Sequence, residues 1–491
     1  MMRARSKLAL FALAMLLAAM VDGQQTPRCP TFPIDVIPGC ANGPHSPALA
    51  PLLSAIADRS LLGPNGAIEI YSKLSANDQQ NARACLRTAA AQEADYIMKL
   101  YLQGDELDVV ALSGCASELY QETDRIARIG DPSLQDDFWL ARADFFKAWR
   151  LLFTEPNRAT DALKLLQESI RLSPDDVYHW NATGIAYLQE RKYGCAQAAF
   201  EKAIRGANKT PCGEDMFTPG NNTADDNRVG RGKKELWIYP RTNLALVEIE
   251  KGNYGEARAA YEELIKESAA AGKRFGYLDY NLALLLQHLG DNKSARDEYR
   301  KALTDFSERA SNAQAVGDQD LAQEFQRRQA EVHNALGTVA SSTGRFADAE
   351  TQYLKALQFN PTLSTAQYNL GLLYRRRGRS AEAIASWQKT VAADPRFLPA
   401  HLALARELAR TRATQEAISH YQAVLAEAPT YEEALIGLGD QLAALQRVDE
   451  ACRQYRAAAG GTDLSRLSRS RRTLCTKKAA STGVEPGAGI P

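Results

Sequence analysis

The sequence lacks an excess of charge of either sign, because 59 Lys and Arg residues are balanced by 59 Asp and Glu residues among 491. A protein that binds nucleic acid or an anionic membrane through its overall field carries a marked positive excess. The composition therefore argues against nucleic acid and membrane surfaces as partners. Apolar residues make up 45% of the chain, which is ample for a packed core.

Long apolar runs are also missing, apart from Leu8–Met20, which follows a short basic start and precedes the small residue Gly23. A membrane-spanning helix needs about 20 apolar residues. This run is short for a retained anchor and is typical of a cleaved signal peptide. We therefore predict a signal peptide over residues 1–23, a periplasmic or secreted protein, and no membrane span after cleavage.

Cysteine is scarce, and none of the eight residues forms the Cys-x-x-Cys pattern typical of a zinc site. An even number of cysteines in an oxidising compartment favours disulfides. Spacing alone does not fix their connectivity, and buried free thiols are the alternative. The nearest sequence neighbours would pair as Cys29–Cys40, Cys85–Cys115, Cys195–Cys212 and Cys452–Cys475.

Catalytic signatures are absent as well. The six histidines are scattered, and there is no His-Glu-x-x-His motif, phosphate loop, dinucleotide fingerprint or nucleophile elbow. We therefore predict a protein that is not an enzyme and uses no cofactor or metal. An active site in the N-terminal segment or in the loop over 211–232 is the less favoured alternative.

The sequence does contain an unbroken repeat of 34 residues between Ala330 and Ser465. In each unit a leucine is followed by Gly or Ala, then by an alanine and an aromatic residue. Small residues let two helices approach closely, and the aromatic is expected to fill the gap between neighbouring helix pairs. The recurring residues are Leu336, Leu370, Leu404 and Leu438; Gly337, Gly371, Ala405 and Gly439; Ala349, Ala383, Ala417 and Ala451; and Tyr353, Trp387, Tyr421 and Tyr455.

The period is that of a known helix–turn–helix repeat. One unit resembles a tetratricopeptide repeat through Leu370-Gly371-Leu372-Leu373-Tyr374, Ala383, Trp387 and Pro395. The resemblance implies an all-α fold, an α-solenoid forming a right-handed superhelix of about eight units with capping helices at both ends. His333 and His401 fall at the fourth position of their units, which the family fills with a packing residue.

The pattern weakens toward the N-terminus and is interrupted where Gly, Pro, Asn and Asp replace apolar residues after Pro211. A charged segment after Ala310 interrupts it again, by lengthening a second helix or adding a short one. The predicted organisation is a signal peptide (1–23), a Pro-rich segment and N-terminal helical cap (24–142), repeat units (143–210), a surface loop (211–237), repeat units (238–309), a helical insertion (310–329), repeat units (330–465), and a capping helix with a disordered tail (466–491).

Helical periodicity turns positions 2, 5, 6, 9, 12 and 13 of each first helix away from the neighbouring helices. In the family this face resembles a groove for extended peptides. Asparagines recur there, and an amide offers both a donor and an acceptor to a peptide main chain. Tyrosines on the same face add flat surfaces with a polar tip. The predicted peptide-binding residues are Asn243, Asn281, Asn334 and Asn369, with Tyr239, Tyr277, Tyr280 and Tyr368.

Four arginines extend this predicted face, and their guanidinium groups suit carboxylates: Arg375, Arg376, Arg406 and Arg410. The alternative is that arginine is simply a soluble helix former. The sequence therefore predicts an exported, non-catalytic scaffold or adaptor. It would bind a protein or an extended peptide, for which the arginines favour acidic character, and help to assemble or regulate an envelope or secretion complex. The alternative is a module that recognises polysaccharide or peptidoglycan through its tyrosines.

Overall fold

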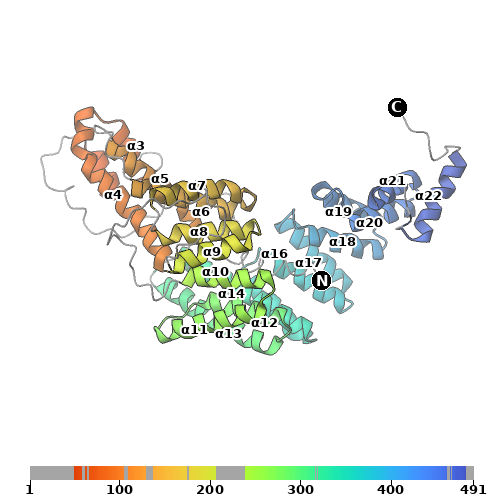
Figure 1. Ribbon diagram of the computed structural model, residues 1–491. Helices are drawn as coiled ribbons and strands as arrows, with labels where there is room; N and C mark the ends of the chain where they lie inside the picture. Colours follow the sequence, from red (N-terminus) through yellow and green to blue (C-terminus); the bar gives the residue numbers. More distant parts are fainter. Residues whose placement is uncertain are drawn as a thin grey trace. The chain divides into compact units, whose positions relative to one another are not determined.

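The chain folds into helices throughout the residues that the computed structural model describes, which are 49–57, 61–62, 66–103, 109–128, 137–173, 176–205, 238–315, 317, 319–461, 465 and 467–482 (Figure 1). Consecutive helices pair as antiparallel hairpins that stack on one another. The predicted all-α solenoid is thereby confirmed. No helix in these ranges is long and apolar enough to cross a membrane. The predicted signal peptide and the loop over 211–237 lie outside the described residues.

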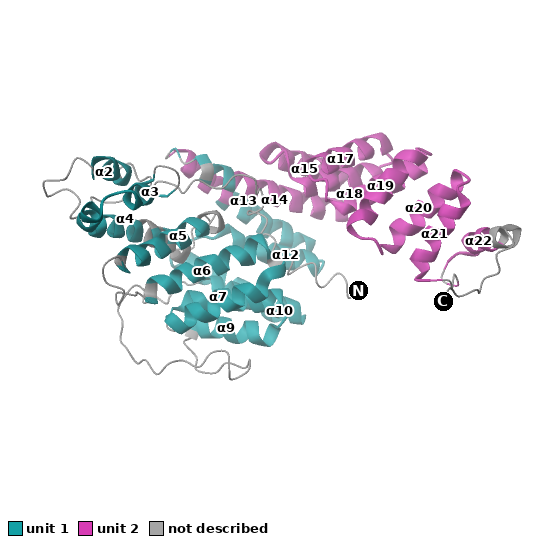
Figure 2. Ribbon diagram, turned by 90° about the horizontal axis from the view of Figure 1, so that it is seen from above, with its two compact units in different colours: residues 1–305, 317–324 teal, residues 306–316, 325–491 magenta. Residues whose placement is uncertain are grey.

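Two compact units divide the chain (Figure 2): unit 1 comprises residues 1–305 and 317–324, and unit 2 comprises 306–316 and 325–491. The helices of unit 1 are α2 (Ala50–Ala57), α3 (Ala67–Ser72), α4 (Ala76–Gln103), α5 (Val109–Arg128), α6 (Asp137–Thr154), η2 (Pro156–Arg158), α7 (Ala159–Leu172), α8 (Val177–Gln189), α9 (Tyr193–Arg205), α10 (Ile238–Lys251), α11 (Tyr254–Ala270) and α12 (Gly276–His288).

Unit 2 contains the sequence-regular repeats. Its helices are α15 (Phe346–Phe359), α16 (Ser364–Arg376), α17 (Ser380–Ala393), α18 (Leu398–Arg410), α19 (Thr414–Glu427), α20 (Glu432–Ala444), α21 (Val448–Ala459) and α22 (Arg469–Thr482). The unit boundary runs through α13 (Asn292–Ala315) and α14 (Gln319–Ser342). The segment over 310–329 therefore lengthens both the second helix of one hairpin and the first helix of the next.

Four of the described hairpins contain an aromatic ring packed onto a glycine. A Cβ added at Gly371 would lie 2.4 Å from Nε1 of Trp387, a side chain that is fully buried. The same arrangement joins Gly184 to Phe200, Gly337 to Tyr353 and Gly439 to Tyr455. The ring thus packs against the glycine of its own hairpin, not only between neighbouring pairs as expected.

The hairpin with Ala405 in place of glycine differs in one respect. The Tyr421 ring lies so close to Gly437 of the following hairpin that a Cβ there would come within 2.3 Å of it. Gly437 has no counterpart in the recurring pattern, so this contact was not predicted.

The turn between the two helices of a unit takes a left-handed conformation at Gly344 and Gly378, where φ is 77° and 76°. Glycine adopts this conformation without steric cost. Arg412 and Gln446 stand at the same place in the next two units and have φ of 65° and 62°. The turn geometry is therefore imposed by the hairpin even where an L side chain opposes it.

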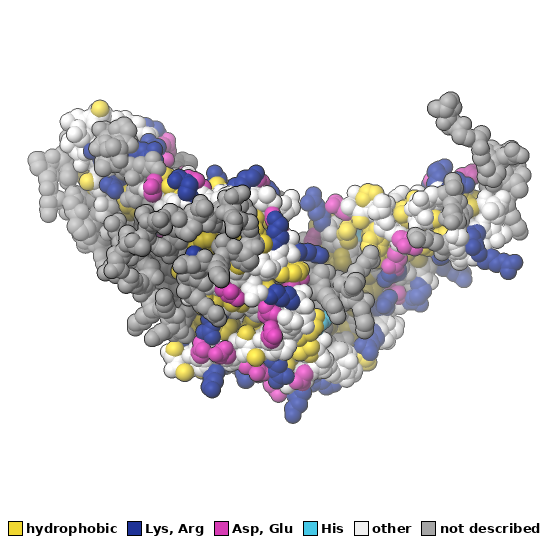
Figure 3. Space-filling view, in the orientation of Figure 1, with side chains coloured by type: hydrophobic (Ala, Val, Ile, Leu, Met, Phe, Trp, Pro, Cys, Tyr) yellow, Lys and Arg dark blue, Asp and Glu magenta, His cyan; other side chains and the backbone are white. Residues whose placement is uncertain are grey.

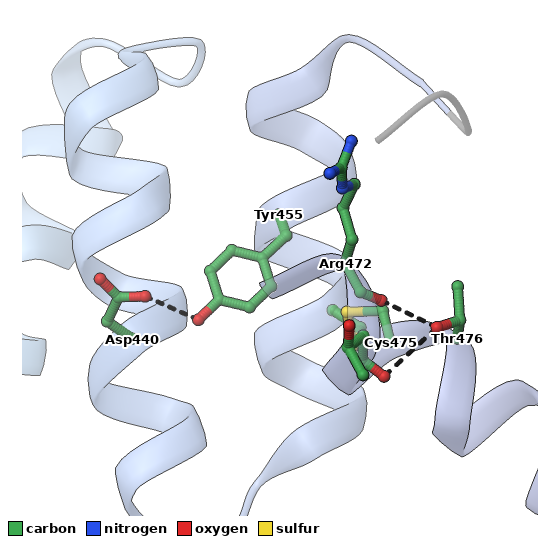
Figure 4. The surroundings of a disulfide bond; sticks show 7 residues. Asp440, Tyr455, Arg472, Cys475 and Thr476 are labelled. Carbon is green, nitrogen blue, oxygen red and sulfur yellow. Dashed lines mark hydrogen bonds between the residues drawn. A yellow bond between two sulfur atoms is a disulfide. The ribbon is translucent and has the colours of Figure 1, made fainter. Parts of the chain in front are cut away.

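The C-terminal cap is fastened by the predicted disulfide Cys452–Cys475, which joins α21 to α22 across 23 residues of sequence (Figure 4). Asp440 of α20 accepts hydrogen bonds from the Tyr455 hydroxyl, at 2.8 Å, and from Nε and Nη2 of Arg471, at 2.8 and 2.6 Å. A loop of this length contributes about 3 kcal/mol to stability when it is closed by a disulfide. The last stacked hairpin is thus covered by a bonded helix.

The remaining cysteine predictions are settled only in part. Cys85, Cys115 and Cys195 are all disulfide-bonded, so none of them is the free thiol considered as the alternative. Cys29, Cys40 and Cys212 lie outside the described residues. The pairing Cys85–Cys115 and the two pairs that involve undescribed cysteines stay predictions.

Candidate peptide-binding surface

The first helices of the hairpins form the inner side of each stack. In unit 1, α6 contacts α8 and α8 contacts α10; in unit 2, α18 contacts α20. Among the described residues, the second helices of neighbouring hairpins do not contact one another to this extent. At these contacts the first helices lie closer to one another than the second helices do. Residues that project from the first helices therefore face the inner side.

Three of the four predicted asparagines take part in asparagine pairs that join successive first helices. In unit 2, Nδ2 of Asn369 donates to Oδ1 of Asn334 at 2.9 Å. In unit 1, Nδ2 of Asn243 donates to Oδ1 of Asn181 at 3.0 Å. Asn181, at position 5 of its unit, was not among the predicted residues. Its signal in the sequence is the position that it shares with Asn334.

Burial separates these two asparagine pairs. Asn181 is fully buried and Asn243 is only 3% exposed, and Asn281 is buried as well. Asn334 and Asn369 are both partly exposed. Their mutual hydrogen bond uses one donor of Asn369 and one acceptor position of Asn334, which leaves the other amide groups of both residues without a partner in the described part of the chain. Among the predicted asparagines, all of which lie in the described residues, Asn334 and Asn369 are the two with amide groups accessible to a ligand.

The predicted tyrosines also divide into two groups. Tyr239 and Tyr277 are partly exposed, and their rings stack with centroids 6.3 Å apart and an interplanar angle of 13°. Tyr280 is 3% exposed and meets the Tyr299 ring edge-on at 5.4 Å. Tyr280 therefore contributes to packing inside unit 1 and presents no flat surface, which differs from the expectation for its position.

All four predicted arginines are exposed, and three of them are engaged within unit 2. Nη1 of Arg376 donates to the Ser341 carbonyl oxygen at 3.0 Å. Arg410 forms an ion pair with Glu407 at 2.6 Å, and Arg406 forms one with Glu433. Arg375 makes no side-chain hydrogen bond or ion pair with the described residues. Of the four predicted arginines, Arg375 therefore has the guanidinium group that is most available to a ligand.

Electrostatics place two of these arginines beside Tyr368. Burial raises the pKa of the Tyr368 phenol, whereas the charges of Arg406 and Arg375 lower it. Both guanidinium groups therefore act on the same phenol. We call Asn334, Tyr368, Asn369, Arg375 and Arg406 the unit 2 surface. It combines amide groups, an aromatic ring and two positive charges. On the face of the molecule shown in Figure 3, acidic and basic side chains are mixed.

Unit 1 contains a buried carboxyl group that the sequence analysis did not single out. Asp279 of α12 is 6% exposed. Burial raises its pKa to about 7; the carboxylates of Glu298 and Asp305 raise it too, and Lys301 and Arg274 lower it. Near neutral pH this group is partly protonated, which avoids burying a full negative charge beside Glu298.

We expect Asp279→Asn to stabilise the protein increasingly as the pH rises from about 4 to about 7. In that range the folded state keeps the proton of Asp279 and the unfolded state, with the ordinary pKa of 3.8, has lost it. The ionisation of Asp279 therefore lowers the free energy of unfolding of the wild type by up to about 1.4 kcal/mol per pH unit as the pH rises. The amide of the Asp279→Asn variant does not titrate, so the variant avoids this decrease. Urea unfolding at pH values across the range measures the effect.

The control for this prediction is Glu308→Gln, a substitution at an exposed position of α13. It should leave the pH dependence of the free energy of unfolding unchanged. An Asp279→Asn variant whose stability runs parallel to the wild type at every pH would show that Asp279 is ionised in the folded state.

Comparison with known proteins supports the repeat assignment. The model of the tetratricopeptide repeat family matches three segments, residues 156–211, 242–315 and 334–396. They fall in both units, and the third segment includes the recurring residues of the first two regular repeats, from Leu336 to Trp387. No curated protein matches the sequence.

Several solved structures are similar in fold. PilF of Pseudomonas aeruginosa is 20% identical over 48% of this chain and 96% of its own, with a TM-score of 0.38. A tetratricopeptide repeat protein of Parabacteroides merdae is 15% identical over 61% and 99%, with a TM-score of 0.37. YrrB, described as having an unusual peptide-binding site, is 19% identical over 45% and 97%, with a TM-score of 0.32. These values are too low to transfer a ligand or a partner. Over the three matched segments the chain is built of tetratricopeptide repeats, and the described helices form the hairpins that such repeats produce.

Proposed function

We propose that the protein is a non-catalytic adaptor that binds an extended segment of another protein on the unit 2 surface. The observation that carries this proposal is the partly exposed amide pair, in which Asn369 and Asn334 bridge two successive first helices at 2.9 Å. The backbone N–H and C=O groups of an extended peptide are free to form hydrogen bonds with the protein, whatever the side chains of the peptide are. Two fixed amides with unused capacity can bind such a chain whatever its sequence.

The charges of the unit 2 surface favour an acidic ligand. Arg375 makes no side-chain hydrogen bond or ion pair with the described residues, although its charge lowers the pKa of the nearby Glu407. Arg406 shares its charge with a single carboxylate, Glu433. A guanidinium group binds a carboxylate through two parallel hydrogen bonds. The ligand we propose is therefore a peptide with acidic side chains or a free carboxyl end lying against Tyr368.

Export is part of the proposal and rests on the sequence of residues 1–23, with a basic start and a short apolar run. The bonded state of the described cysteines is compatible with an oxidising compartment. We propose that the adaptor serves an envelope or secretion complex. Mass spectrometry of protein from the native host would find a chain beginning at Gln24; a chain that retains Met1 would contradict cleavage.

The experiment selects binders from a random peptide library on the full-length protein and measures affinities by fluorescence anisotropy. Asn334→Ala with Asn369→Ala should weaken the best peptide by about tenfold or more, since each lost hydrogen bond contributes about 0.5–1.5 kcal/mol. Circular dichroism should show unchanged helicity, because both residues are partly exposed.

The matched control removes two exposed amides from second helices, Gln388→Ala in α17 and Gln422→Ala in α19. This variant should bind as the wild type does. Equal affinities in all three proteins would remove the asparagine pair from the binding surface, and a selection that recovers no peptide would count against the function itself.

A second candidate function is glycan recognition, and the stacked rings of Tyr239 and Tyr277 favour it specifically. Paired aromatic faces provide broad apolar platforms with polar hydroxyl tips. Retention on a column of immobilised peptidoglycan, lost in Tyr239→Ala with Tyr277→Ala, would support this function. Retention that survives both substitutions would exclude the stack as the glycan site.

A further inference from the structure

Two histidines of unit 2 face each other across one hairpin. His401 lies on α18 and His420 on α19, both are partly exposed, and their Nδ1 atoms are 3.0 Å apart. Nε2 of His401 is 3.1 Å from the carbonyl oxygen of Pro395. From the sequence, His401 was expected to have a packing role and His420 none.

The Pro395 carbonyl fixes the tautomers of both rings. A carbonyl oxygen only accepts hydrogen bonds, so Nε2 of His401 carries the proton. Neutral His401 then has a lone pair at Nδ1, and His420 must donate its Nδ1–H to it. A single proton therefore lies between two imidazole nitrogens that point at each other.

The chain contains a reference pair at the same place in another hairpin. His333 and Gln352 stand two 34-residue periods before His401 and His420, and Nδ1 of His333 is 2.8 Å from Oε1 of Gln352. Because an amide oxygen only accepts, His333 donates there. A glutamine suffices to satisfy the histidine at this place, so the fold does not require the second imidazole.

We propose that His401 and His420 form a binding site for one divalent transition-metal cation, Zn²⁺, Ni²⁺ or Cu²⁺, held by the two Nδ1 atoms. Imidazole nitrogen suits these ions. Metal–nitrogen bonds of about 2.0–2.1 Å at tetrahedral angles place two ligand nitrogens roughly 3.3 Å apart, so the rings need to separate by only a few tenths of an ångström.

The surroundings of His401 match those of a metal-binding histidine. Such a residue usually donates its other ring N–H to a carboxylate, a carbonyl or water, which holds the ring and directs the lone pair. His401 does this through Pro395. On binding, the proton of His420 moves from Nδ1 to Nε2 through solvent, and the net charge of the two rings is unchanged.

Two imidazoles are the whole protein contribution to this site. The described residues contain no cluster of three or more metal-binding side chains. Water would complete the coordination, and the partial exposure of both rings leaves room for it. The site is therefore a moderate-affinity one with open positions, unlike a closed structural zinc site.

The test uses the full-length, tag-free protein with its disulfides intact, titrated with Zn²⁺, Ni²⁺ and Cu²⁺ by calorimetry at slightly alkaline pH. We expect one ion per chain. His420→Gln recreates the His333–Gln352 pair and should therefore fold, and it should weaken binding by at least about tenfold. His333→Gln is the matched control and should leave the dissociation constant unchanged.

Two results would overturn the proposal: absence of saturable binding of all three ions by the wild type, or an unchanged dissociation constant in His420→Gln. Electron paramagnetic resonance of the Cu²⁺-loaded wild type gives a readout that does not depend on any variant. Coupling to two imidazole nitrogens is expected, and coupling to one or none contradicts the site.

Discussion

Gly371→Ala is expected to destabilise unit 2 by about 2–4 kcal/mol, opposite in sign to the usual effect of replacing a helical glycine. In an exposed helix interior, alanine is more favourable than glycine by about 1 kcal/mol. At Gly371 the new Cβ would lie 2.4 Å from Nε1 of Trp387 and 2.7 Å from its Cδ1. The indole is fully buried and cannot move without opening the hairpin.

Two costs add up to this expected loss of stability. Overpacking a tight core costs about 1–3 kcal/mol. Nε1 of Trp387 also donates to the Tyr368 carbonyl oxygen at 3.2 Å, and a displaced indole would lose this bond. Leaving a buried donor unpaired costs about 1–3 kcal/mol more. Since the stacked hairpins depend on their neighbours, the loss should spread along unit 2.

The chain offers a matched control in Gly255 of α11, where an added Cβ meets nothing within 4 Å. Gly255→Ala should be neutral or stabilising in the same urea unfolding experiment. Adding Trp387→Leu to Gly371→Ala should cost less than the two changes do separately, because the smaller side chain removes the clash. A Gly371→Ala variant that is as stable as the wild type would show that the glycine–aromatic contact does not hold the hairpin.

The same contact explains why so much of the fold could be predicted from the sequence. A glycine at Gly371 and an indole at Trp387 recur in kind every 34 residues, so hairpin stacking leaves a periodic trace. Glycine turns leave a similar trace at Gly344 and Gly378. The sequence does not predict the left-handed turn at Arg412, because the packing of the neighbouring helices imposes this conformation on a residue other than glycine.

The candidate surface could be predicted less completely, for a physical reason. Periodicity assigns a residue to one side of a helix, but it does not say whether neighbouring helices cover that side. Asn281 and Asn369 share position 6 of their units, yet Asn281 is buried and Asn369 is partly exposed. The pairing of His401 with His420 was hidden because it joins two helices across a turn and depends on ring orientation.

Reversing two charges on the unit 2 surface should abolish binding of acidic peptides. Arg375→Glu with Arg406→Glu replaces two attractive groups beside Tyr368 by repulsive ones, and it leaves Glu433 without its partner. We expect a loss of about 100-fold or more in affinity, since removing one partner of a close charge pair costs about 2–5 kcal/mol and reversal adds repulsion. Both arginines are exposed, so the free energy of unfolding should change little.

The control reverses two exposed arginines of α21, Arg453→Glu and Arg456→Glu, and so makes the same change in net charge on a second helix. Affinity should fall only slightly, and the residual effect should vanish at high salt because distant charges are screened. An equal loss of affinity in both variants would show that acidic peptides are attracted only by the net charge of the protein and not by the unit 2 surface. Comparing each selected peptide with its C-terminally amidated form then decides the ligand: a loss on amidation identifies a chain terminus, and unchanged binding identifies acidic side chains.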